Sequence, residues 1–175
     1  MPDEIYDVVD KEGNKISTAT WTEVHTKGLL HQVASVLIFK DDSKEEVLIQ
    51  KRSANMKQHP NLWQHSAGGH ILTGQTPDEA IRREIQEEIF HNHDLPDFKI
   101  NKVCSFFVND APGNNEIMHL YKAVYPGPFF NNPKEVSEEP RWIKVVDLQN
   151  DMFRNPSKYS PGSHRIMKEY FEAKK

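Results

Sequence analysis

The sequence predicts an α/β sandwich, in which a mixed and largely antiparallel β-framework packs against two main helices. Three observations support this fold class: short β-type runs are separated by turn-forming stretches, one segment combines a helix-capping signal with isoleucines at four-residue spacing, and a second amphipathic segment lies near the C-terminus. The 175 residues contain no internal repeat and no low-complexity segment, so residues 1–175 are expected to form a single domain.

The strands are expected where β-type residues form short runs bounded by turn residues. The runs that meet this description are Ile5–Val9, Val33–Phe39, Glu46–Gln50, Ile100–Val108, Ile117–Val124 and Arg141–Val146. Together they predict the mixed, largely antiparallel sheet.

The first helix is expected to begin at Pro77. Thr76 supplies an N-cap hydroxyl, and Glu79, three residues after the cap, completes a capping box. One stripe of the helix is expected to be buried against the sheet because isoleucines recur every four residues, at Ile81, Ile85 and Ile89.

The second helix is expected over residues 163–173. Its apolar side chains recur at helical spacing, at Ile166, Met167, Tyr170 and Phe171. A short helix over residues 146–151 carries a much weaker signal.

The composition disfavours several classes of partner. With 22 Lys+Arg against 26 Asp+Glu, a net charge of −4 and no basic block, a nucleic-acid polymer is not expected as a partner. Residues 33–39 form the most apolar stretch and are far too short to span a bilayer, so no membrane partner is expected. Cys104 is the single cysteine, which excludes an intramolecular disulfide and favours a reducing, cytoplasmic location.

Three glutamates share one side of the first helix. At 100° per residue, Glu84, Glu87 and Glu88 fall within an arc of about 100° that borders the isoleucine stripe, at the expected rim of the core. Like charges at this spacing repel, and a hard divalent cation with oxygen ligands would stabilise them. The alternative is a solvated helix face neutralised by Arg82 and Arg83.

The residues around the arc form a wider pattern. Gly69 lies at the end of an expected strand, and fourteen positions later the chain reads Arg83-Glu84-Ile85-Gln86-Glu87-Glu88. This segment, residues 69–91, resembles the Nudix box. The chain departs from the family's form at Gln75, in place of the first glutamate, at Phe90, in place of the closing glycine, and at His91, in place of the last aliphatic residue. The helix C-cap is therefore expected to pass to Asn92.

The resemblance implies a Nudix-type α/β/α sandwich with a mixed β-sheet. It further implies that Mg²⁺ or Mn²⁺ assists hydrolysis of a diphosphate linkage in a small organic diphosphate, such as a nucleoside di- or triphosphate or a nucleotide sugar. The metal ligands carried over from the family are Glu84, Glu87, Glu88 and the carbonyl of Gly69, and Arg83 is expected to orient a glutamate. The base that activates water stays open among Glu84, Glu116 and the pair Glu138–Glu139.

Substrate contacts are also expected from the resemblance. Arg52 matches a diphosphate-binding arginine, and its guanidinium suits phosphate oxygens. Lys57 is either a helper or a solvated lysine, and Trp63 either stacks on a nucleobase or belongs to the core. Assembly as a homodimer is left open.

The resemblance covers most of the chain in one branch of the family, which includes type I isopentenyl-diphosphate isomerase. The segments that carry it are residues 5–13, 25–31, 48–53, 60–63 and 66–70. Where these isomerases keep metal ligands, the chain has His25, His31, His70 and Glu116, which implies a second metal site. The alternative is that each histidine is a capping or core residue.

Two chemical parts of the isomerases are missing. Gly68 stands in place of their cysteine and Gly162 in place of a tryptophan, while Trp21 replaces a phosphate-binding lysine. Cys104 lies on a different expected strand and is interpreted as a small buried side chain. The sequence therefore favours a hydrolase over an isomerase, with the isomerase and a non-catalytic nucleotide-binding sensor as alternatives.

Overall fold

The structure, a computed structural model, describes residues 4–56, 58–111 and 113–173. Its strands are β1 (Ile5–Val9), β2 (Lys15–Thr20), β3 (His31–Phe39), β4 (Glu46–Lys51), β5 (Trp63–Gln64), β6 (Ala67–His70), β7 (Ile100–Ala111), β8 (Asn114–Val124) and β9 (Arg141–Lys144). Its α-helices are α1 (Trp21–Lys27), α2 (Pro77–Ile85), α3 (Val145–Arg154) and α4 (Pro161–Glu172), with a π-helical turn at Gln86–Phe90 and a 3-10 turn at Pro156–Lys158. Among the described helices, none combines the length and the apolar character needed to cross a bilayer.

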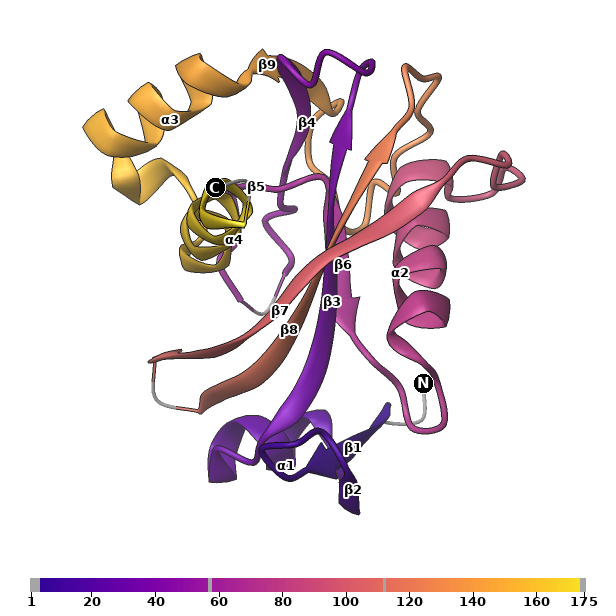
Figure 1. Cartoon of the computed structure of the whole chain (residues 1–175), viewed down its shortest axis with the longest axis vertical. Helices are drawn as coiled ribbons and strands as arrows, with labels where there is room; N and C mark the ends of the chain where they lie inside the picture. The colour runs from indigo at the N-terminus through magenta and orange to yellow at the C-terminus, as the bar shows by residue number, and fades with distance from the viewer. Residues whose placement is uncertain (1–3, 57, 112, 174–175) are drawn as a thin grey trace.

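Strand β3 runs through the middle of the sheet (Figure 1). It pairs in parallel with β8, from His31 opposite Glu116 to Phe39 opposite Val124, and antiparallel with β6. Strand β7 pairs antiparallel with β8, and β4 pairs antiparallel with β5 and β9. The mixed, largely antiparallel sheet predicted from the sequence is confirmed.

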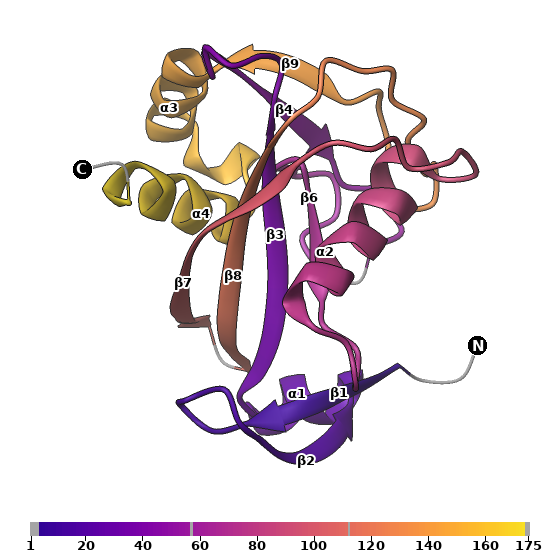
Figure 2. The same ribbon diagram turned by 45° about the vertical axis from the view of Figure 1, so that its right-hand side comes forward.

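Helices cover both faces of this sheet (Figures 1 and 2). Helix α2 lies on one face, where the predicted isoleucine stripe is fully buried, at Ile81, Ile85 and Ile89. Helices α3 and α4 lie on the other face and bury Leu148 and Ile166 against the sheet. The arrangement confirms the predicted α/β/α sandwich.

The helix bounds differ from the expected ones at several ends. Helix α2 begins at Pro77 with the predicted capping box. Helix α4 begins earlier than expected, at Pro161, because Ser160 supplies the cap. Helix α3 covers Val145–Arg154, so the strand expected to reach Val146 ends at Lys144 and the weakly marked helix is longer than expected.

Strand β2 and helix α1 were not predicted. Helix α1 nevertheless has the same local signal as α2, because Thr20 accepts from the Glu23 backbone and the Glu23 side chain accepts from Thr20 in return. Gly28 ends the helix in the left-handed conformation, with φ 60°. This short helix positions His25 near β3.

The end of helix α2 corrects the expected C-cap at Asn92. The helix widens into the π-helical turn, and His91 takes the positive φ of 44° that ends it. Two carbonyls of the turn accept hydrogen bonds from a distant segment: Ile89 O from Phe130 N at 2.7 Å and Glu88 O from Asn132 N at 3.2 Å. The widened turn thus binds the loop that follows β8.

Candidate active site

Glu84 and Glu88 lie about one turn apart and are both buried, with 7% and 4% of their surface exposed. Glu87 points outward, and 47% of its side chain is exposed. The prediction that all three carboxylates lie at the rim of the core is therefore wrong for Glu84 and Glu88. For Glu84 the reason is the close approach of strand β6 to helix α2, and Glu88 lies against the buried Gln50 of β4.

Gly69 of β6 makes room for Glu84. A Cβ atom added to Gly69 would lie 2.4 Å from Glu84 Oε1 and 2.6 Å from the carboxyl carbon. Such distances lie far inside van der Waals contact, so any side chain at this position would displace the carboxylate. A glycine is required at this position for Glu84 to lie against the strand.

Arg83 is the main cationic partner of these carboxylates. Its Nη2 lies 2.7 Å from Glu84 Oε1, and its Nη1 lies 2.9 Å from Glu87 Oε2. Nη2 also donates to the backbone oxygen of His70 at 2.8 Å. Gln75, one of the departures from the family's pattern, accepts from Arg83 Nε at 3.4 Å. The guanidinium therefore orients Glu84 and Glu87 and joins helix α2 to strand β6.

Glu88 meets a buried amide from strand β4. Gln50 Nε2 donates to Glu88 Oε2, while Gln50 Oε1 is buried without a hydrogen-bond partner. Burial raises the pKa of Glu84 and Glu88, and repulsion from neighbouring carboxylates raises it further. A buried oxygen without a donor and two carboxylates that repel each other are stabilised by a divalent cation, so these residues fit such an ion.

Arg52 lies at the end of β4, close enough to Glu88 and Glu135 to interact electrostatically with both. Its Nε donates to the Gln58 backbone oxygen at 3.0 Å, and its Nη1 donates to Gln64 Oε1 at 2.6 Å. These bonds fix the guanidinium next to the glutamates. Lys57, the second expected substrate contact, lies outside the described residues.

Trp63 belongs to the opposite layer. Its ring packs against the core under helices α3 and α4, and the guanidinium of Arg141 lies 3.8 Å from the ring centroid. Lys51 Nζ lies 5.9 Å from the same ring. The contacts assign Trp63 to packing and to a cation–π pair, in keeping with the core alternative.

His25, His31 and His70 come together from α1, β3 and β6. One ligand atom from each lies within 4.8 Å of the others, and His25 Nε2 is 3.1 Å from His70 Nε2. Glu116 faces the group from β8, with Oε1 3.8 Å from His31 Nε2. Burial lowers the pKa of His31 to about 4 and that of His70 to about 3, so these rings are neutral at pH 7, as metal ligands must be.

Backbone contacts orient two of the three rings. His31 Nδ1 lies 2.8 Å from Leu29 O and His25 Nδ1 lies 3.2 Å from Gly113 O, which leaves the Nε2 atoms directed into the group. Since Arg83 also bonds the backbone of His70, the histidine group and the glutamates lie on either side of one strand segment. The resemblance to the isomerases predicted that the three histidines lie close together. Their spacing in the sequence alone could not predict this.

Comparison with known proteins shows the family to which this chain belongs. The family model described as the NUDIX domain matches residues 29–166. The chain belongs to the Nudix family. It is 32% identical over 170 residues to a protein of Serratia proteamaculans named isopentenyl-diphosphate Delta-isomerase, with 95% of this chain and 91% of the relative covered.

Several solved structures share the fold. DR0079 from Deinococcus radiodurans superimposes with a TM-score of 0.76 at 19% identity, covering 94% of this chain and 98% of the other. A MutT NUDIX hydrolase from Burkholderia pseudomallei superimposes with a TM-score of 0.59 at 18% identity, covering 79% and 96%. At these identities the likeness concerns the fold alone.

Gly68 and Gly162, the two glycines that are expected where the isomerases have a cysteine and a tryptophan, have different surroundings. A Cβ atom on Gly68 would lie 2.5 Å from Ser35 Oγ and 2.7 Å from Ala34 O, so a cysteine does not fit without movement of β3. A Cβ atom on Gly162 would meet nothing within 4 Å. A side chain at position 68 would therefore clash with the sheet, whereas position 162 is open.

The glutamates outside the box that were considered as the base for water activation differ in their surroundings. Glu138 forms an exposed ion pair with Lys51 at 2.5 Å, and Glu139 is exposed as well. Glu116 belongs to the histidine group. Sequence reasoning missed Glu135, which is half-buried and interacts electrostatically with Glu84 and Glu88. The one sequence signal that could have suggested Glu135 is that it lies three residues before Glu138–Glu139, the pair considered as a possible base.

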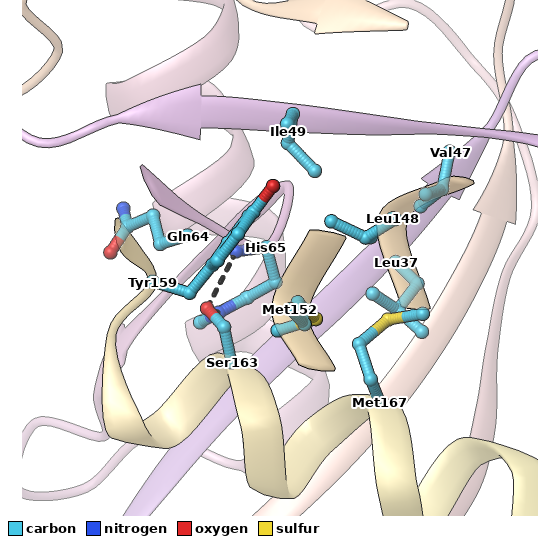
Figure 3. A pocket seen from close by; sticks show the side chains of 10 residues that line it. All are labelled: Leu37, Val47, Ile49, Gln64, His65, Leu148, Met152, Tyr159, Ser163 and Met167. Atoms are coloured by element: carbon cyan, nitrogen blue, oxygen red, sulfur yellow. Dashed lines mark hydrogen bonds between the residues drawn. The ribbon is translucent and has the colours of Figure 1, made fainter. Parts of the chain in front are cut away.

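A separate cavity lies between the sheet and helices α3 and α4 (Figure 3). Mostly apolar side chains line it, together with His65, whose Nδ1 lies 3.2 Å from Ser163 Oγ. None of the candidate Nudix site residues is among the residues that line it. The cavity is thus distinct from both the glutamates and the histidine group.

Proposed function

We propose that this Nudix protein hydrolyses a diphosphate linkage in a small organic diphosphate, with a divalent cation such as Mg²⁺ or Mn²⁺. A nucleoside di- or triphosphate or a nucleotide sugar is the proposed substrate. The observation that carries the proposal is the buried pair Glu84 and Glu88, with an orphaned amide oxygen of Gln50 beside it and Arg52 within electrostatic range. A solvated, salt-bridged helix face would leave both carboxylates exposed.

Each residue has a role in this proposal. Glu84 and Glu88 would hold the cation, with Glu87 and the carbonyl of Gly69 as further ligands, and the ion would supply charge that polarises phosphorus and lowers the pKa of a water molecule. Arg52 binds phosphate oxygens, which its planar guanidinium matches. Water adds to phosphorus, its proton passes to a carboxylate base, and the bond from phosphorus to the bridging oxygen breaks. Of the candidate bases, Glu84 and Glu116 are favoured because Glu138 and Glu139 are exposed, and Arg83 keeps Glu84 oriented.

Phosphate release across a panel of nucleotides, nucleotide sugars and isoprenoid diphosphates tests the proposal. The parent is expected to turn over at least one compound with Mg²⁺ or Mn²⁺ and none with a chelator. Glu84→Gln and Glu88→Gln are each expected to reduce turnover by at least 100-fold. A loss on the order of 100-fold is typical when one group that stabilises charge in a transition state is removed. The matched control is Glu46→Gln, which changes a half-buried carboxylate at the other end of β4. Full activity in both site variants would refute the proposal, and tight binding without turnover would favour the sensor.

Isomerisation of isopentenyl diphosphate is the second candidate function. The name of the Serratia relative and the convergence of three histidines with Glu116 favour it. The crowding at Gly68 disfavours it, because the isomerase-like cysteine has no room there. Incubation with isopentenyl diphosphate in D₂O, followed by NMR, decides: deuterium exchange into the product would establish isomerisation, and unchanged substrate would dismiss it.

The histidine group is proposed as a second metal site for Mn²⁺, Zn²⁺ or Mg²⁺. Neutral imidazoles with one nearby carboxylate suit these ions. A reducing, cytoplasmic location is proposed as well, because Cys104 is a free, partly buried thiol.

A further inference from the structure

Tyr6 of strand β1 lies between the histidine group and the glutamates. Its side chain is 1% exposed, and its ring centroid lies 4.9 Å from that of His70. Its backbone forms a β-bridge with Leu72, in the segment that joins β6 to helix α2. Its hydroxyl group interacts electrostatically with Glu84 and Arg83. The ring is thus fixed at the junction of the two groups.

The Tyr6 hydroxyl group holds the carboxylate of Glu4. It donates to Glu4 Oε2 at 2.6 Å, and Glu4 itself is exposed. Among the described residues, none donates a hydrogen bond to the other oxygen of this carboxylate, Oε1. An acceptor that is already held in one place loses little conformational freedom when a ligand binds. Glu4 therefore presents a preorganised acceptor to solvent.

Glu4 lies near the arginine that is proposed to bind the diphosphate. Glu135 interacts electrostatically with Arg52, Arg83 and Glu4, so these three side chains lie around one carboxylate. The guanidinium of Arg52 attracts phosphate oxygens, whereas the carboxylate of Glu4 repels them. A diphosphate compound bound here is therefore oriented with its phosphates towards Arg52 and its organic group towards Glu4.

The charge of Glu4 also discriminates between organic groups. A carboxylate accepts hydrogen bonds from hydroxyl groups, and a carboxylate bonded to a ribose hydroxyl group is a recurring arrangement in dinucleotide-binding proteins. Removing water from an ionised carboxylate is costly when no new hydrogen bond replaces the water, so an apolar chain over Glu4 is disfavoured.

We infer that Glu4 binds the organic group of the diphosphate substrate and favours groups with adjacent hydroxyls, such as ribose or another sugar, over apolar chains. This inference rests on the proposed function for its diphosphate and deepens it. Tyr6 is then a positioning residue, because it is buried and acts by holding Glu4.

Calorimetric binding of three probes that cannot be hydrolysed, in the presence of Mn²⁺, tests the inference. α,β-Methylene-ADP carries the ribose hydroxyls, its dideoxy form lacks them, and methylenediphosphonate carries the phosphorus groups alone. The parent is expected to bind α,β-methylene-ADP at least tenfold more tightly than the dideoxy form, which is typical of a hydrogen bond to a charged group. Glu4→Ala is expected to bind both nucleotide probes with affinities within about twofold of each other, and to keep its affinity for methylenediphosphonate within about threefold.

Three further variants separate recognition from folding. Tyr6→Phe keeps the packed ring and removes the hydroxyl group, so it is expected to reduce the preference for the ribose hydroxyls at least threefold without loss of methylenediphosphonate binding. Glu4→Gln keeps an acceptor oxygen and is expected to retain part of the preference. Glu12→Ala is the matched control, because it removes an exposed carboxylate in the turn between β1 and β2, and it is expected to retain the whole preference. Circular dichroism confirms that each variant is folded.

A parent that binds the two nucleotide probes equally, or binds neither, would overturn the inference. A preference that survives in Glu4→Ala would overturn it as well. In either case phosphate release by the parent would leave the hydrolase proposal intact. A preference that disappears in Glu4→Ala, in a parent that hydrolyses nothing, would support Glu4 as the contact to the organic group and refute the hydrolase.

Discussion

Replacing Glu88 with glutamine is expected to stabilise the cation-free protein. Glu88 is 4% exposed, and burial together with the charges of Glu84 and Glu135 raises its pKa well above 4.5. A carboxyl group whose pKa is higher in the folded than in the unfolded chain opposes folding at pH 7. The glutamine is uncharged, and its oxygen still accepts from Gln50.

The size of the effect follows from the same linkage. A carboxyl group that is protonated when folded and has a pKa of 4.5 when unfolded opposes folding at pH 7 by at most about 3.4 kcal/mol, since each pH unit between the two values contributes about 1.36 kcal/mol. Attraction to Arg52 is lost in the variant and reduces the gain. A net stabilisation of about 1–3 kcal/mol is expected, or a rise in Tm of roughly 2–10 °C.

Urea and thermal unfolding of the parent and Glu88→Gln in a chelator, at pH 7 and pH 5, measure this gain. It is expected to shrink at pH 5, because the unfolded carboxyl group is then partly protonated too. Glu87→Gln is the matched control: its carboxylate is exposed, so no gain is expected. With saturating Mn²⁺ the parent should gain stability and Glu88→Gln should not. A variant less stable than the parent at pH 7 in chelator would refute the reasoning.

Three other results are expected. Gly69→Ala should displace Glu84, weaken Mn²⁺ binding and lower the free energy of unfolding by about 1–3 kcal/mol. Gly162→Ala should leave Mn²⁺ affinity unchanged and should not lower Tm, because its Cβ enters open space in helix α4, where alanine is the better helix former. Arg83→Ala should destabilise the protein by about 2 kcal/mol in urea unfolding, since the buried Glu84 loses its counter-charge, and wild-type stability would contradict this. The free energy of unfolding of the cation-free protein, measured in urea, should fall as the pH is lowered from 6.5 towards 4. Buried histidines have a lower pKa in the folded chain than in the unfolded chain, so acid protonates the unfolded chain at a higher pH and favours it. A free energy of unfolding that does not change over this range would contradict the prediction. Burial lowers the pKa of four histidines to about 3 or 4: His31, His65, His70 and His119. Glu84 and Glu88 oppose this trend, because their raised pKa values favour the folded state in acid.

Local signals predicted the parts of the fold that depend on neighbouring residues. The capping box at Thr76 and the isoleucines spaced by four define where α2 begins and which side it buries, and the structure confirms both. The capping box at Thr20 and Glu23 is the same signal, and it could have found helix α1. The expected strands are present, with ends that shift by up to three residues.

The depth of the glutamates depends on tertiary contact and could not be read from helical angles. The angular arc correctly puts Glu84 and Glu88 next to the isoleucine stripe, but Gly69 brings β6 close enough to enclose Glu84. Glu135 was missed because a single glutamate in a loop has no periodicity. Its position follows from the hydrogen bonds that the loop makes to Glu88 and Ser53.

The departure from the family pattern at Phe90 explains how the loop is held. A glycine at this position would allow a left-handed residue to end the helix, whereas Phe90 is 1% exposed and packs against Phe98 and Tyr125. This packing keeps the chain helical through position 90, so the helix ends one residue later, at His91, after a π-helical turn. The carbonyls of the turn then bind the 129–136 loop. The substitution that removes the glycine cap therefore belongs to the same structural feature that brings Glu135 to the site.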